Sequence, residues 1–139
     1  MKIRIILGSK YKSTVPFCHI ESKHSHGQIF LEGKETVFES DFDMGGEDYI
    51  SITFSNKDDA DNNVVSIKKI SVDEIDMQHF IYKGEFKPNY NKDWYEKQDP
   101  RPPLTYSPCT ELRHNGTWSL KVNTPIWKTI MENWIQDEK

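Results

Sequence analysis

Several features that mark particular classes of protein are scarce or missing in this chain. Only two cysteines, Cys18 and Cys109, occur among 139 residues, so the sequence does not describe a disulfide-stapled scaffold. Basic residues form no block and the net charge is −4, so we expect no nucleic-acid-binding surface. No apolar run approaches the roughly 20 residues that cross a bilayer, so we expect no membrane insertion.

The chain also lacks the short motifs of common enzymes. There is no glycine-rich phosphate loop, nucleophile elbow or zinc-protease motif, and we therefore expect a protein that is not an enzyme. The start, MKIRIILGSKY, has an apolar run that is short and broken by Arg4, unlike a secretory signal. We expect synthesis in a cytoplasm, where the two cysteines would usually stay as buried thiols, with a disulfide across the sandwich as the alternative.

What the chain does contain is a repeated alternation of apolar and polar residues, which is typical of half-buried strands. Turn residues such as SKHSHG and EGKE separate these segments. The alternation changes parity across Lys68 and Lys69, which predicts a β-bulge. The strands predicted in this part of the chain are 3–7, 17–20, 28–31, 36–39, 50–55 and 65–72. Another extended segment is predicted to begin with Phe80 and Tyr82.

A second group of strand-like residues lies near the end of the chain. Residues 111–113 and 118–122 flank Asn115-Gly116, a pair that favours the tight turn of a hairpin because both turn positions need positive φ. We therefore predict that these two segments form a hairpin.

Between the two groups, residues 86–108 form a region rich in proline and aromatic residues. Its proline density excludes a central strand or a helix interior. Its aromatic residues would be unnecessary in a free linker, so we predict a long ordered arm that lies on the domain or on a neighbour. Loops of this length are usually functional or disordered. The aromatic residues concerned are Phe86, Tyr90, Trp94, Tyr95 and Tyr106.

The chain closes with an amphipathic pattern over 125–136. Thr124 suits the N-cap and Pro125 the first helical position. Apolar residues, including Trp127 and Trp134, then recur at helical spacing. We predict a terminal helix that covers a sheet face, with a partner surface as the alternative. Together these elements predict a single, mainly β domain over 1–139. It is an antiparallel β-sandwich of jelly-roll type with about eight strands and a C-terminal amphipathic helix.

Acidic and amide residues are concentrated in one loop, 56–63, between two predicted strands. Asp59, Asp61 and Asn63 have the spacing that begins a calcium-binding helix-loop-helix. Val64 stands where that motif has glycine, and Ile70 where it has glutamate, so the motif fails. Exposed hairpin turns use the same residue types. The loop is therefore interpreted first as a solvated turn and second as a metal site.

The stretch from Tyr49 to Asp76 resembles small calcium-dependent xylan-binding modules. The resemblance lies in Phe54-Ser55-Asn56, in the acidic loop and in the end of the next strand, Ile70-Ser71-Val72-Asp73-Glu74-Ile75. Lys57 departs from the pattern, because such modules carry an acidic ligand there. The resemblance implies a jelly-roll domain in which Asp58, Asp59 and Asp61 would be the ligands of a Ca²⁺ ion.

More of the chain resembles small uncharacterised β-sandwich proteins of tailed marine phages, of the cyanophage type. The likeness lies in Met1 to Tyr11 and in Trp118 to Trp134. It implies a structural or adhesion module of a virion, associated with tail, baseplate or capsid and made in the host cytoplasm. Its partners would be other virion proteins in a multi-copy assembly.

Two functions follow as alternatives. In the first, the arm and the terminal helix make assembly contacts through rigid aromatic side chains, which are good interface anchors. The candidate contact residues are Tyr90, Trp94, Tyr95, Tyr106, Trp127 and Trp134. In the second, the chain is a carbohydrate-binding module for host surface glycan, with exposed aromatic rings stacking on sugar and calcium as its one potential cofactor. An acidic pair in a cleft would be needed for a third, enzymatic function.

Overall fold

The computed structural model describes residues 1–58, 60–77, 81–107 and 109–123. The predicted helix at 125–136, with Trp127 and Trp134, lies outside these residues, as does Asp59. Within them, no helix is long and apolar enough to span a membrane.

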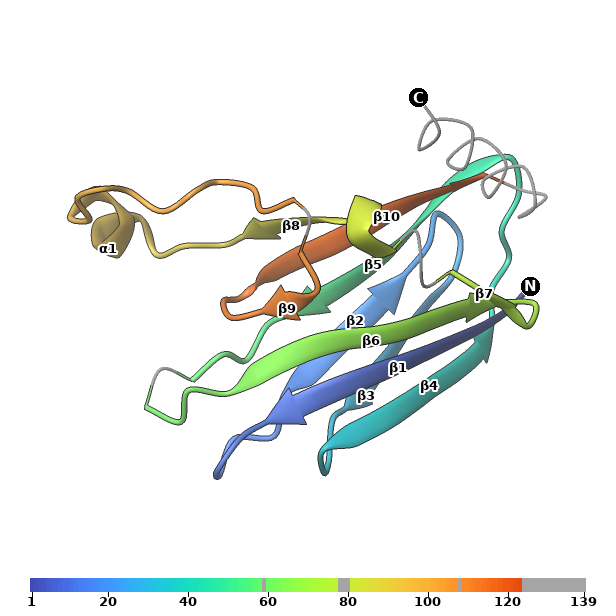
Figure 1. Ribbon diagram of the computed structural model, residues 1–139, viewed down its shortest axis with the longest axis horizontal. Helices are drawn as coiled ribbons and strands as arrows, with labels where there is room; N and C mark the ends of the chain where they lie inside the picture. Colours follow the sequence, from blue (N-terminus) through green and yellow to red (C-terminus); the bar gives the residue numbers. More distant parts are fainter. Residues whose placement is uncertain (59, 78–80, 108, 124–139) are drawn as a thin grey trace.

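The strands form two antiparallel sheets that face each other (Figure 1). In the first sheet the order is β4-β1-β6-β7, and β9 also pairs with β6. In the second sheet the order is β3-β2-β5-β10-β8. The first sheet contains β1 (Lys2–Lys10), β4 (Glu35–Asp41), β6 (Val64–Val72), β7 (Ile75–Asp76) and β9 (Glu111–Leu112). The second contains β2 (Phe17–Glu21), β3 (His26–Phe30), β5 (Glu47–Phe54), β8 (Glu85–Pro88) and β10 (Gly116–Asn123).

A mainly β, two-sheet architecture is therefore confirmed, and the described residues hold ten strands instead of about eight. The finer assignment to the jelly-roll type stays a prediction. One hydrophobic core fills the space between the sheets. Ile3, Ile5 and Leu7 of β1 are fully buried, and Ile50 and Ile52 of β5 face them from the second sheet. Each such side chain contributes about 1.5–3 kcal/mol through its burial.

The predicted β-bulge is present where β1 pairs with β6. Ile6 lies opposite Lys69, but the next residue, Leu7, lies opposite Ile67, so Lys68 is the extra residue. The bulge allows Ile67 and Ile70 to point into the same core although they are three positions apart along β6.

The predicted hairpin at Asn115-Gly116 is wrong. β9 pairs with β6 in the first sheet, whereas β10 pairs with β5 and β8 in the second. Residues 113–115 therefore cross between sheets. In this segment Asn115 makes two tertiary hydrogen bonds. Its Oδ1 accepts the Lys57 N–H over 2.7 Å, and its carbonyl accepts the Asn89 N–H over 2.6 Å. These tertiary contacts override the local turn preference of the Asn-Gly pair.

A second segment also differs from expectation. Extended structure was predicted to begin at Phe80 and Tyr82, but Ile81–Lys83 forms a 3₁₀ turn, η1, and Phe80 lies outside the described residues. β8 follows η1 and is the last strand in the order of the second sheet, an edge position where Pro88 is tolerated.

The arm leaves the sandwich after β8 and contains a short helix, α1 (Lys92–Glu96). Figure 1 shows α1 beyond the end of both sheets. The chain then returns beside its own start, because Phe86 and Tyr106 form a two-way backbone bridge with N···O distances of 2.9 and 2.8 Å. The arm is thus a closed excursion that is tied to the sandwich at its base.

Candidate functional site

The arm and the crossing segment enclose a cleft of about 450 Å³, which we call the aromatic cleft. Tyr90 comes from the chain after β8, Trp94 from α1 and His114 from the segment before β10. Polar groups complete the lining, namely Lys57, Asn89, Asn91 and Asn115. The cleft therefore combines three aromatic rings with three amide side chains.

The three rings are in mutual contact. The ring centroids of Tyr90 and Trp94 are 5.7 Å apart, those of Tyr90 and His114 are 5.2 Å apart, and those of Trp94 and His114 are 6.3 Å apart. These separations lie in the range preferred by aromatic pairs. Even so, Trp94 stays 44% exposed. A rigid indole is thus available to solvent.

Trp94 is positioned by a helix cap. Asn91 lies in extended conformation before α1, and its Oδ1 accepts the Trp94 N–H over 3.1 Å. An N-cap of this kind satisfies one of the free N–H groups at a helix start. No residue of α1 is buried. The helix therefore contributes little to the core, and it places the Trp94 indole at the surface.

Tyr90 anchors the inner side of the cleft. Its hydroxyl donates to the Pro103 carbonyl over 2.8 Å and contacts the Tyr106 hydroxyl at 3.3 Å. Burial, together with the hydrogen bond to Tyr106, raises the pKa of Tyr90 above its usual value, so the phenol stays neutral. On its other side, Tyr90 stacks on Tyr95 with the ring planes 14° apart.

The structure thus gathers the four arm residues that were selected from the sequence. Tyr90, Trp94, Tyr95 and Tyr106 form one connected group. Sequence reasoning missed His114 and the three asparagines of the cleft. The Asn-Gly pair was a signal at Asn115, but local turn preference gave it a different meaning.

The acidic loop is not a hairpin turn, and it is only partly exposed. It connects β5 in one sheet to β6 in the other, and Asp61 and Asn63 are buried. Three backbone N–H groups converge on the Asp61 carboxylate. Those of Lys12 and Ser13 reach Oδ1 at 2.9 and 3.0 Å, and those of Lys12 and Thr14 reach Oδ2, both at 3.1 Å.

The pKa of Asp61 reflects two opposed effects. Burial acts to raise it, but the backbone N–H groups of Ser13, Thr14 and Lys12 and the charge of Lys12 stabilise the carboxylate. The donors prevail, and the pKa of Asp61 lies below its usual value.

Asp58 and Asn63 close the rest of the loop. Asp58 accepts the Thr14 hydroxyl over 2.7 Å and the Ala60 N–H over 3.0 Å. Asn63 Oδ1 accepts the Asp58 N–H over 2.8 Å, and its Nδ2 donates to the carbonyls of Thr14 and Asn56. Two of the predicted metal ligands, Asp58 and Asp61, therefore lie near one another. Their carboxylate oxygens accept hydrogen bonds from protein N–H and O–H groups. In the part of the chain that is described, no three His, Cys, Asp or Glu side chains are grouped as a metal would require.

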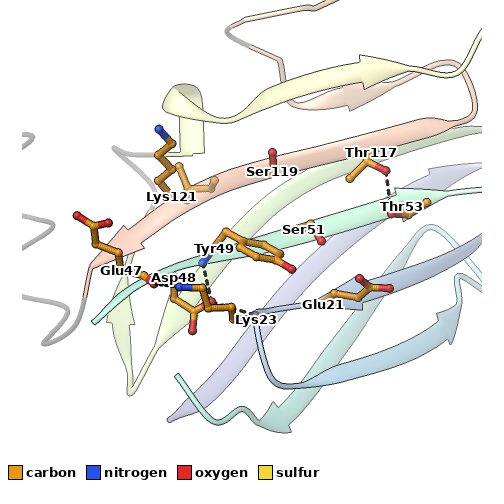
Figure 2. A pocket seen from close by; sticks show the side chains of 11 residues that line it. Glu21, Lys23, Glu47, Asp48, Tyr49, Ser51, Thr53, Thr117, Ser119 and Lys121 are labelled. Carbon is orange, nitrogen blue, oxygen red and sulfur yellow. Dashed lines mark hydrogen bonds between the residues drawn. The ribbon is translucent and has the colours of Figure 1, made fainter. Parts of the chain in front are cut away.

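A larger groove, of about 730 Å³, lies on the outer face of the second sheet. Its floor consists of hydroxyl side chains on β5 and β10, where Ser51 lies opposite Ser119 and Thr53 opposite Thr117. The two threonine hydroxyls bond to each other over 3.0 Å. Figure 2 shows Tyr49, Glu21 and Lys121 around this floor. The sheet-face groove has one aromatic ring, against three in the aromatic cleft.

Asp48 lies at the end of this groove and is 6% exposed. Its Oδ1 accepts the N–H groups of Lys23 and Tyr49 over 3.0 and 2.7 Å. Its Oδ2 is buried and has no hydrogen-bond partner among the described residues. A buried carboxylate oxygen without a donor costs free energy.

Comparison with known proteins gives a fold likeness and no sequence family. No family model and no curated protein matches this sequence. Two solved structures are similar in fold. One is vCBM60 in complex with galactobiose, with a TM-score of 0.61, 11% identity, and coverage of 88% of this chain and all of that one.

The other is a selenomethionine form of vCBM60, with a TM-score of 0.59, 13% identity, and coverage of 85% of this chain and 89% of that one. It is described with a circular permutation that links two families of calcium-dependent carbohydrate binding modules. The likeness to phage proteins is not shown by these structures. The chain therefore shares its fold with carbohydrate-binding modules, in agreement with the resemblance to xylan-binding modules noted in the sequence.

Proposed function

We propose that this protein is a non-catalytic carbohydrate-binding module that holds glycan in the aromatic cleft. The observation that carries the proposal is the half-exposed Trp94 indole beside Tyr90 and His114. A pyranose ring presents a face of C–H groups, which gains dispersion contacts and loses hydration when it packs on such a ring. The shared fold with carbohydrate-binding modules supports this function over a purely structural one.

The asparagines supply the polar part of the recognition. Asn91 and Asn115 each use Oδ1 to accept a backbone N–H, so Nδ2 is the group that each offers to a sugar oxygen. A few fixed donors around an apolar surface are typical of small-ligand sites. Because both amides are held by backbone contacts, the donors are positioned before the ligand arrives.

The aromatic cleft suits glycan better than the sheet-face groove does. In the groove, the hydroxyls of Thr53 and Thr117 already bond to each other, and Tyr49 is the one ring that lines it. A sugar face there would have a single half-buried ring to pack on. The aromatic cleft offers an exposed indole on a projecting arm instead.

We also propose that this module is carried on a phage particle. A glycan-binding cleft on an arm that extends beyond the sandwich suits a module that attaches a particle to host surface glycan. Tail, baseplate or capsid proteins would then be the partners of the remaining surface.

A glycan panel tests the function. The purified protein is applied to immobilised neutral and acidic oligosaccharides, galactobiose included, next to the variants Trp94→Ala and Leu104→Ala. Leu104 is 67% exposed on the same arm and serves as the matched control. We expect binding to a subset of glycans that Trp94→Ala loses and Leu104→Ala keeps. Absence of binding across the panel, or equal binding by both variants, would contradict the proposal.

A further inference from the structure

The acidic loop contains the residues at which the sequence resemblance to calcium-dependent xylan-binding modules implies a Ca²⁺ ion, and its contacts disagree with that expectation. Calcium takes six to eight oxygen ligands whose lone pairs point at the ion. Here both oxygens of Asp61 point at the backbone N–H groups of residues 12–14. A cation at that position would meet the positive ends of three N–H dipoles.

The side-chain oxygens of the other residues of the loop that the structure describes are engaged in the same way. Asp58 Oδ2 accepts a hydroxyl, Asp58 Oδ1 accepts a backbone N–H, and Asn63 Oδ1 accepts another. Lys57 Nζ donates to the Asn63 carbonyl over 2.6 Å and to Asn62 Oδ1 over 3.3 Å. An ammonium group thus lies among the oxygens of the loop, at the residue that departs from the xylan-module pattern.

We infer that the acidic loop of this chain is a cation-free clasp, in which protein donors occupy the place of a calcium ion and the domain folds and binds glycan without calcium. The clasp joins two segments distant in sequence, because residues 12–17 are held to residues 56–63. Asn56 adds to it, since its Oδ1 accepts the Phe17 N–H over 2.8 Å and its Nδ2 donates to the Val15 carbonyl over 2.9 Å.

The clasp also reaches the aromatic cleft. The Lys57 N–H donates to Asn115 Oδ1, and the Asn115 carbonyl accepts the Asn89 N–H, so one side of the cleft is fixed to the loop. In this chain the acidic loop is thus a positioning element for the ligand site. The part of the inference that concerns glycan rests on the proposed function; the part that concerns folding does not.

Thermal melts test the folding part first. The melting midpoint of the wild-type protein is measured in EDTA and in millimolar calcium, with magnesium as the ionic control. Binding to the folded state alone would raise the midpoint by mass action, and an occupied calcium site would raise it by several degrees. We expect equal midpoints in all three conditions. A rise specific to calcium would overturn the inference.

Variants then identify the donors as the source of the clasp. Asp61→Asn keeps an acceptor oxygen but loses the charge, and Asp61→Ala removes both. Asp41→Asn, at an exposed position on β4, is the matched control. We expect midpoints that fall in the order Asp41→Asn, Asp61→Asn, Asp61→Ala, with the same order in EDTA. Asp61 variants that match the control in EDTA and differ from wild type only in calcium would show a metal ligand instead.

Glycan binding in EDTA tests the second part. A glycan found on the panel is titrated into wild-type protein in EDTA and in calcium, and we expect equal affinities. A loss of binding in EDTA that calcium restores would overturn the inference while leaving the proposed function intact. If no glycan binds in either condition, the proposed function fails, and the melts still decide whether the clasp is free of calcium.

Discussion

The backbone N–H of Lys57 donates to Asn115 Oδ1 over 2.7 Å, and this bond joins the acidic loop to the aromatic cleft. Removal of the acceptor breaks the hydrogen bond of a partly buried N–H, and the loss of such a bond costs about 1–3 kcal/mol. We therefore expect Asn115→Ala to lower both the free energy of unfolding and the glycan affinity. Asn115→Asp keeps the acceptor and should unfold like wild type. Urea unfolding of both variants measures the difference, and equal losses would contradict this role of the bond.

Asp61 gives stability a specific dependence on pH. Its pKa in the folded protein lies below the ordinary value of about 3.9, so the unfolded state binds the proton more readily. The carboxylate therefore stabilises the fold above about pH 4, and this contribution is lost as pH falls through the folded pKa. We expect the melting difference between wild type and Asp61→Asn to be full at pH 7 and to shrink below about pH 4. A difference that is constant across pH would show that ionisation of Asp61 is irrelevant.

The buried Oδ2 of Asp48 has no hydrogen-bond partner among the described residues, and we therefore expect two substitutions of Asp48 to affect stability differently. Asp48→Ala leaves the N–H groups of Lys23 and Tyr49 without their acceptor and should lose about 1–3 kcal/mol of unfolding free energy. Asp48→Asn keeps an acceptor for both and removes a buried charge, whose Oδ2 has no donor in the described residues. We expect Asp48→Asn to be at least as stable as wild type in urea. A variant as unstable as Asp48→Ala would show that the charge is needed.

The two thiols should differ in reactivity. Burial raises the pKa of Cys18 to about 12, and it also raises the pKa of Cys109, which is only half-buried and donates to the Glu111 carbonyl over 3.2 Å. Because the thiolate is the reactive form, a thiol reagent at pH 8 should modify Cys109 before Cys18. Mass spectrometry of the native protein measures the order, and modification of both in denaturant is the control. Equal rates in the native state would contradict the burial of Cys18.

The parts of the fold that local pattern determines could be predicted from the sequence. Alternation over 50–54 marks β5 because one face of that strand is buried, and the change of parity across Lys68 and Lys69 marks the bulge for the same reason. The crossing at Asn115 could not be predicted. Its conformation is decided by Lys57 and Asn89, which are distant in the chain.

The candidate site was only partly predictable for a related reason. Its aromatic residues stand out in a proline-rich region, so Tyr90 and Trp94 could be selected as candidate contact residues. The acidic loop has the composition of a metal site, and composition does not show where backbone donors are. Only the tertiary structure brings the N–H groups of residues 12–14 to Asp61.

The location of the glycan-binding site is tested most directly by isothermal titration calorimetry, in which one glycan is titrated into wild type, Trp94→Ala and Tyr49→Ala. Trp94 lines the aromatic cleft and Tyr49 lines the sheet-face groove, so the two variants separate the two surfaces. We expect Trp94→Ala to weaken binding by about tenfold or more, which is ~1.4 kcal/mol, and Tyr49→Ala to bind like wild type. Loss of binding in Tyr49→Ala with wild-type affinity in Trp94→Ala would place the glycan on the sheet face and contradict the account.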